Sequence, residues 1–168
     1  MNRKNFLMNT LTGASSIAFA PLSSFAKYST DPEPYKLEMV KEFVIAGHGN
    51  FPRVKEMLEQ YPNLIFCRYD WGNGDFEEAI EGAGHVGNKE IARFLIAQGA
   101  RANMYALTML GETTIVKSIL EKYPSQLYGK GPHGFTLLHH AIKGGEDAKE
   151  LLEYVQSKGL TEMQYKIK

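Results

Sequence analysis

The sequence has only one cysteine, Cys67, among its 168 residues. A single cysteine cannot form a disulfide within the chain, so an apolar core has to stabilise the domain. Cys67 ends the apolar run of residues 64–67 (LIFC). A free cysteine in such a run is usually a small buried hydrophobe, so we assign no chemistry to it.

The sequence also has no excess of charge of one sign. Lysine plus arginine and aspartate plus glutamate both number 19, which gives a formal net charge of +0. A neutral chain has no overall field to attract phosphate backbones or anionic lipid, so we do not expect nucleic acid as a partner. Hydrophobic residues make up 43% and charged residues 23%. This usage is typical of a globular domain and argues against long disorder or a fibrous class.

A membrane-spanning run is missing as well, because spanning takes about 20 mainly apolar residues. The first 26 residues look like an export signal instead. Arg3 and Lys4 supply positive charge, residues 6–20 are weakly apolar, and Ser24 and Ala26 give the small-x-small pattern of a cleavage site. The sequence predicts a signal peptide over residues 1–26, cleaved after Ala26, and a linker over residues 27–35.

The export route stays open between two alternatives. Residues 3–8 (RKNFLM) resemble the twin-arginine export signal, with Lys4 in place of the second arginine. The general secretory route fits the charge, the apolar run and the cleavage site equally well. Either route predicts a bacterial protein that is periplasmic or secreted, with no stable membrane insertion after cleavage.

Export gives the first testable prediction. Protein isolated from the cell envelope is expected to begin at Lys27, because signal peptidase would cut after Ala26. N-terminal sequencing or intact-mass measurement checks this expectation. A cytoplasmic product that still carries Met1 would contradict it.

Internal repetition is the strongest pattern in the sequence. Residues 54–62 (VKEMLEQYP) recur as residues 116–124 (VKSILEKYP), with six of nine positions identical. Two weaker copies place apolar residues with the same i, i+3, i+4 spacing at residues 91, 94 and 95 and at residues 148, 151 and 152. This spacing puts each apolar triplet on one face of a helix that must be buried. The pattern predicts four similar helices.

Each of these helices follows a glycine and a polar residue. The pairs are Gly49 and Asn50, Gly87 and Asn88, Gly111 and Glu112, and Gly145 and Glu146. Glycine ends a preceding helix readily in a left-handed conformation, so the chain can turn and start an antiparallel helix. The sequence therefore predicts an all-α fold of about four helix-turn-helix repeats, with a glycine spacing that averages near 33 residues.

Two segments resemble ankyrin repeats. Residues 134–141 (GFTLLHHA) are similar to the ankyrin motif G-x-T-P-L-H-x-A, with Leu137 in place of proline, and residues 99–103 (GARAN) resemble the closing G-A-x-x-N. The resemblance implies an ankyrin-like solenoid over residues 36–158 with irregular finger loops, and a terminal tail over residues 159–168. Thr136, His139 and Ala141 match structural positions of the motif. His139 is expected to bond the backbone of a neighbouring repeat, and His140 to be partly exposed.

The resemblance implies recognition of another protein by a monomer without catalysis or cofactor. A small accessory or protective subunit for an exported enzyme is the alternative. Two loops are the candidate contact tips because they carry aromatic, arginine and turn residues. Their contact residues are Arg68, Tyr69, Asp70, Trp71 and Asn73 in the first loop, and Lys130, His133 and Phe135 in the second. In the alternative interpretation Trp71 covers a junction between repeats and the second loop is a plain finger.

Catalytic and metal-binding patterns are weak. A hydrolytic enzyme would use His133 or His140 as base with Asp70 or Asp75, or Cys67 as nucleophile, but no spacing in the sequence brings these residues together. The sequence has no phosphate-binding glycine loop, HExxH or GxSxG. Asp70, Asn73 and Asp75 do not follow the EF-hand spacing. We therefore predict no catalytic residue and no metal ligand.

Overall fold

The computed structural model describes residues 32–167. The signal peptide predicted over residues 1–26 lies outside this range, and so does most of the predicted linker. The repeats belong to one compact unit that begins at Tyr35. Within the described range, no helix combines the length and the apolarity that crossing a membrane requires.

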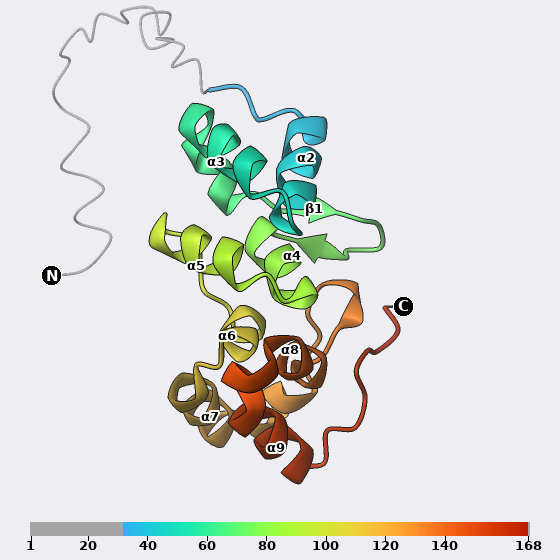
Figure 1. Cartoon of the computed structure of the whole chain (residues 1–168). Coiled ribbons are helices and arrows are strands. Elements are labelled where there is room, and N and C mark those ends of the chain that lie inside the picture. The colour runs from blue at the N-terminus through green and yellow to red at the C-terminus, as the bar shows by residue number, and fades with distance from the viewer. Residues whose placement is uncertain (1–31, 168) are drawn as a thin grey trace, which may run out of the picture. The chain divides into compact units, whose positions relative to one another are not determined.

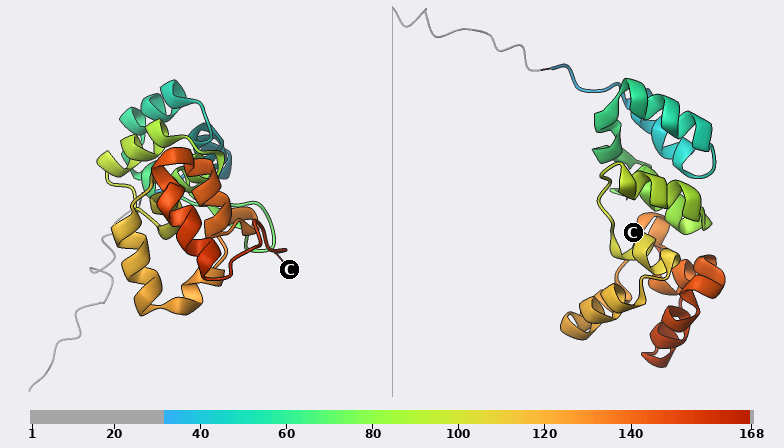
Figure 2. Two further views of the ribbon diagram at one scale, coloured as in Figure 1. Left: turned by 60° about the horizontal axis from the view of Figure 1, so that its bottom comes forward. Right: turned by 60° about the vertical axis from the view of Figure 1, so that its left-hand side comes forward.

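The unit is mostly helical, so the all-α prediction is confirmed (Figure 1). Its α-helices contact one another in successive pairs. The pairs are α2 (Leu37–Gly47) with α3 (Phe51–Gln60), α4 (Ala79–Val86) with α5 (Lys89–Ala97), α6 (Met104–Leu110) with α7 (Thr113–Lys122), and α8 (Leu137–Gly144) with α9 (Lys149–Ser157). The right-hand view of Figure 2 shows the pairs following one another in chain order.

Short elements connect the pairs. The two strong sequence copies end alike, because α3 leads into the 3-10 helix η2 (Pro62–Phe66) and α7 into η3 (Pro124–Tyr128). After η2, the strands β1 (Tyr69–Asp70) and β2 (Phe76–Glu77) form an antiparallel hairpin. After η3, the 3-10 helix η4 (Pro132–Gly134) leads into α8. We call the β1–β2 hairpin the first finger and residues 129–136 the second finger.

The apolar triplets are buried as the helical spacing predicts. Val54, Ile91, Val116 and Ala148, which open the four triplets, are all fully buried. The buried residues form two apolar clusters, one from α2 to α6 and one that α7, α8 and α9 share with the C-terminal segment. The first helices of the pairs connect the two, since α2 packs on α4, α4 on α6 and α8, and α6 on α8.

Most of the predicted turns use glycine as expected. Gly87 and Gly111 have φ of 87° and 79°, in the left-handed region where glycine is favoured. Asn50 and Asn88 accept hydrogen bonds from backbone N–H groups three residues on and so cap α3 and α5. Gly49 differs, because His48, the residue that follows α2, is right-handed and Gly49 has no positive φ.

The C-terminal tail predicted over residues 159–168 packs against the repeats. Leu160 is only 1% exposed and joins the second apolar cluster. Further on, Thr136 N–H donates to Met163 O over 3.1 Å, and Tyr165 N–H donates to Gly134 O over 2.8 Å. Residues 163–165 therefore pair with the second finger and fix its position.

Candidate metal centre

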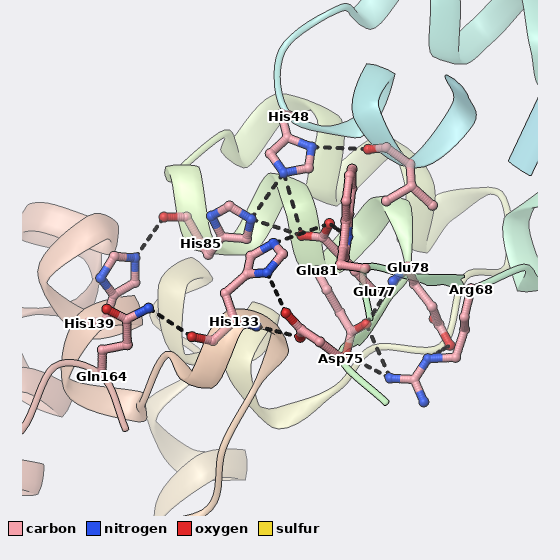
Figure 3. A network of polar contacts seen from close by, with 12 residues as sticks. His48, Arg68, Asp75, Glu77, Glu78, Glu81, His85, His133, His139 and Gln164 are labelled. Carbon is pink, nitrogen blue, oxygen red and sulfur yellow. Dashed lines mark hydrogen bonds and ion pairs between the residues drawn. The ribbon is translucent and has the colours of Figure 1, made fainter. Parts of the chain in front are cut away.

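Three histidines and one glutamate from separate segments meet at one place (Figure 3). His48 follows α2, Glu77 lies in β2, His85 lies in the last turn of α4, and His133 lies in the second finger. One ligand atom from each of the four residues lies within 4.8 Å of every other. The fold thus brings together side chains that are up to 85 residues apart in the sequence (133 minus 48).

Small residues allow this close approach. A Cβ on Gly82 would lie 2.7 Å from the imidazole of His48, so only glycine leaves room for the ring on α4. A Cβ on Gly47 would collide with the backbone of Ala79 at the start of α4. Because both positions are glycine, α2 and α4 pack closely and His48 lies beside His85.

The distances between the four side chains suit the binding of one shared metal ion. His85 Nε2 is 2.8 Å from Glu77 Oε1 and 3.0 Å from His48 Nε2. His48 Nε2 is 3.4 Å from Glu77 Oε1, and His133 Nε2 is 3.5 Å from Glu77 Oε2. Ligand atoms about 2.0–2.1 Å from a tetrahedral metal ion lie about 3.4 Å apart. A small adjustment would place all four around one ion.

The Nδ1 atoms of two of the histidines already have hydrogen-bond partners outside the cluster. His48 Nδ1 lies 3.0 Å from the carbonyl oxygen of Val44, and His133 Nδ1 lies 2.8 Å from Asp75 Oδ2. Since a carbonyl and a carboxylate only accept, Nδ1 carries the proton in both rings. When either ring is neutral, its Nε2 then presents a lone pair to the centre. Carbonyl and carboxylate partners of this kind orient the histidine ligands of protein metal sites.

His133 is held in an unusual backbone conformation. Its φ is 58°, in the left-handed region that residues other than glycine rarely adopt. Asp75 Oδ1 accepts from its N–H over 2.7 Å, and Gln164 Nε2 donates to its carbonyl over 2.8 Å. Strained residues that are held in this way concentrate at functional sites.

Glu77 is a buried carboxylate that pairs with no lysine or arginine of residues 32–167. Its side chain is 0% exposed, and among the described residues its ion-pair partners are His48, His85 and His133. Burial alone would raise the pKa of Glu77, but hydrogen bonds from His48 and His85 and the charges of these two histidines together outweigh burial and lower this pKa to about 2. The hydrogen bond to Glu77 in turn raises the pKa of His48 against the effect of burial. The carboxylate is therefore anionic near neutral pH.

Two neighbouring carboxylates are neutralised differently. Arg68 pairs with Glu81 at 3.2 Å and with Glu78 at 3.6 Å (Figure 3). Arg101 pairs with Glu78 at 3.2 Å. These contacts compensate the buried charges of Glu78 and Glu81. Buried charges in proteins are paired or coordinate metals, and no arginine or lysine in the described part of the chain pairs with Glu77.

Most of the contact residues predicted at residues 68–73, in and just before the first finger, make internal contacts. Arg68 forms the ion pairs described above, and Tyr69 is half-buried against the first apolar cluster. Trp71 is 37% exposed, and its Nε1–H donates to Glu77 Oε2 over 2.8 Å. Asp70 in β1 and Asn73 in the turn of the hairpin are exposed. Trp71 therefore both faces solvent and contacts the candidate ligand Glu77.

The predicted contact residues of the second finger divide in the same way. Lys130 is exposed and donates to the carbonyl of Lys166 over 3.2 Å. His133 joins the four-residue cluster. Phe135 is half-buried and stacks on His139, with ring centroids 4.0 Å apart. His139 also lies 2.8 Å from the carbonyl oxygen of His85 through its Nε2, a backbone contact of the kind that the ankyrin motif implies.

The residues considered for catalysis lie in different surroundings. The expectation that His140 is partly exposed was wrong, because the side chain lies inside the molecule and burial lowers its pKa to about 3. Burial raises the pKa of Cys67, which keeps its thiol protonated. Asp75 and His133 do meet, although no spacing in the sequence indicates this contact.

The sequence analysis did not identify His48, Glu77 or His85 as functional residues. Their positions contain one usable signal, since His48 lies one residue before Gly49 and His85 two residues before Gly87. The two histidines thus end the first helices of consecutive repeats. Residues at equivalent positions of stacked repeats lie side by side, so the pair could have been found from the repeat pattern.

No protein-family model matches the chain, and no curated protein matches it.

Proposed function

We propose that this chain binds one divalent transition-metal ion through His48, Glu77, His85 and His133. The observation that carries the proposal is the convergence of four ligand atoms within 4.8 Å of one another. Imidazole and carboxylate are common ligands of such ions. A divalent cation would also compensate the buried charge of Glu77, which the three histidines compensate only when protonated.

We further propose that the chain is a non-catalytic, ankyrin-like repeat module in which the ion has a structural role. The paired helices, the finger loops and the contact from His139 to the carbonyl of His85 support this architecture. The ion would join the first two repeats to the second finger, since His48 and His85 come from α2 and α4 and His133 from the finger. Recognition of another protein stays a prediction from the ankyrin resemblance.

Titration of the full chain with Zn2+ against a chromophoric chelator tests the metal site. We expect one ion per chain. Glu77→Gln and His85→Gln should each weaken binding by at least about 100-fold, because loss of an outer-shell partner alone typically costs about 10- to 100-fold. Glu78→Gln is the matched control, since this neighbouring carboxylate faces Arg68 and Arg101 instead.

The control separates loss of the site from general damage. Glu78→Gln should bind Zn2+ as the unaltered chain does. Equal weakening by Glu77→Gln and Glu78→Gln, or no bound ion in the unaltered chain, would contradict the proposal. Far-UV circular dichroism of each variant confirms that its helices are intact.

A further inference from the structure

We propose that the centre selects a four-coordinate ion of the zinc type, and that Trp71 is the positioning residue that keeps the coordination number at four. This inference rests on the proposed function and specifies the ion class and geometry. The distinguishing feature is the hydrogen bond from Trp71 Nε1 to Glu77 Oε2, 2.8 Å long. Glu77 Oε1 is the oxygen that His48 and His85 approach.

The ligand set excludes the hard cations. Mg2+ and Ca2+ prefer oxygen ligands, six or more in number. Here three of the four ligands are imidazole nitrogens, which suit Zn2+, Co2+ and related ions. Three nitrogens and one oxygen complete a tetrahedron and leave no ligand position for substrate, as in structural zinc sites.

A fifth ligand from Asp75 is blocked. Its Oδ1 accepts from the backbone N–H of His133 over 2.7 Å, and its Oδ2 accepts from His133 Nδ1 over 2.8 Å. Asp75 therefore orients a ligand and is not one itself. Among the described residues, the metal-ligating cluster contains only His48, Glu77, His85 and His133.

The remaining route to a higher coordination number is chelation by both oxygens of Glu77. The indole N–H can only donate, so it orients the carboxylate with Oε2 toward the indole and Oε1 toward His48 and His85, while His133 Nε2 lies 3.5 Å from Oε2. Trp71 is held in turn by Tyr69, with ring centroids 4.8 Å apart. The backbone N–H of Trp71 also donates to the backbone carbonyl of Asp75 over 2.9 Å. Lys41 Nζ lies 5.7 Å from the centroid of the indole. These contacts position the indole before any ion binds.

Visible absorption of the Co2+-loaded full chain tests this inference. Four-coordinate Co2+ absorbs far more strongly in the visible than six-coordinate Co2+, so the unaltered protein should give an intense spectrum. Trp71→Phe frees Glu77 Oε2 to chelate, and the molar absorbance should fall several-fold while one Co2+ remains bound. Tyr69→Phe is the matched control. It removes a hydroxyl but keeps the ring beside Trp71, so the spectrum should not change.

The outcomes separate the inference from the proposed function. If the unaltered chain binds neither Co2+ nor Zn2+, the proposed function fails. If Co2+ binds but absorbs weakly in the unaltered chain, the four-coordinate geometry is overturned and metal binding stands. An intense spectrum that Trp71→Phe leaves unchanged overturns the role of Trp71. Because Trp71 is the only tryptophan, quenching of its fluorescence by Co2+ measures binding independently.

Discussion

Gly134→Ala is expected to lower the free energy of unfolding by about 3 kcal/mol. Gly134 has a φ of 78°, and a left-handed backbone costs residues with a Cβ about 1–2 kcal/mol. The added Cβ would also collide with the carbonyl oxygen of Tyr165, and relieving such overpacking typically costs about 1–3 kcal/mol more. The C-terminal segment would have to move away from the second finger, and with it the support of His133.

Gly159→Ala is the matched control for this prediction. Gly159 also has a positive φ, 89°, but a Cβ there would meet nothing within 4 Å. The Gly159→Ala substitution should therefore lower the free energy of unfolding only by the backbone strain, about 1–2 kcal/mol. Urea unfolding of both variants gives the comparison, and Zn2+ titration should show weaker binding only in Gly134→Ala. Equal stability losses in the two variants would show that the contact with Tyr165 is not a constraint.

Acid should destabilise the protein through His140. Burial lowers the pKa of this histidine in the folded chain to about 3, against 6.5 for an unperturbed side chain. Between these values the unfolded chain binds a proton at His140 that the folded chain does not. The free energy of unfolding therefore falls as the pH falls below 6.5, by about 1.4 kcal/mol for each pH unit. Above pH 6.5 both states carry a neutral His140 and its contribution is constant.

His140→Gln removes this titration. From about pH 6.5 to about pH 5, the unaltered chain should lose about 2 kcal/mol more stability than the variant. Urea unfolding across this range measures the difference, with a chelator present so that metal release does not contribute. Glutamine still carries an amide donor for the carbonyl of Thr136, which the His140 Nδ1–H contacts over 2.7 Å. Parallel pH profiles of the two proteins would contradict the prediction.

Local signals in the sequence predicted the helices well. The triplets that open at Val54, Ile91, Val116 and Ala148 are buried, because i, i+3, i+4 spacing leaves an apolar face that only packing can cover. The turn glycines were less uniform. Gly87 and Gly111 follow the expectation, whereas α2 ends in a right-handed conformation and leaves Gly49 no special role.

The metal centre could not be predicted from local patterns, because its ligands are close only in the folded chain. His48 and His85 are 37 residues apart and His85 and His133 are 48 apart (85 minus 48, and 133 minus 85). Their approach depends on how repeats stack and on where the second finger is held. His140 shows the same limitation, since its neighbour in sequence, His139, gave no indication that α8 would bury both rings.

The division of the apolar core into two clusters has a consequence for how the molecule unfolds on heating. Repeat proteins are stabilised mainly by contacts between neighbours, so a boundary between clusters is a place where one half can melt before the other. His48, Glu77 and His85 belong to the N-terminal half, and His133 precedes α8 in the C-terminal half. An ion held from both sides would tie the two halves together, so that a stepwise thermal transition of the ion-free protein would merge into a single sharp one.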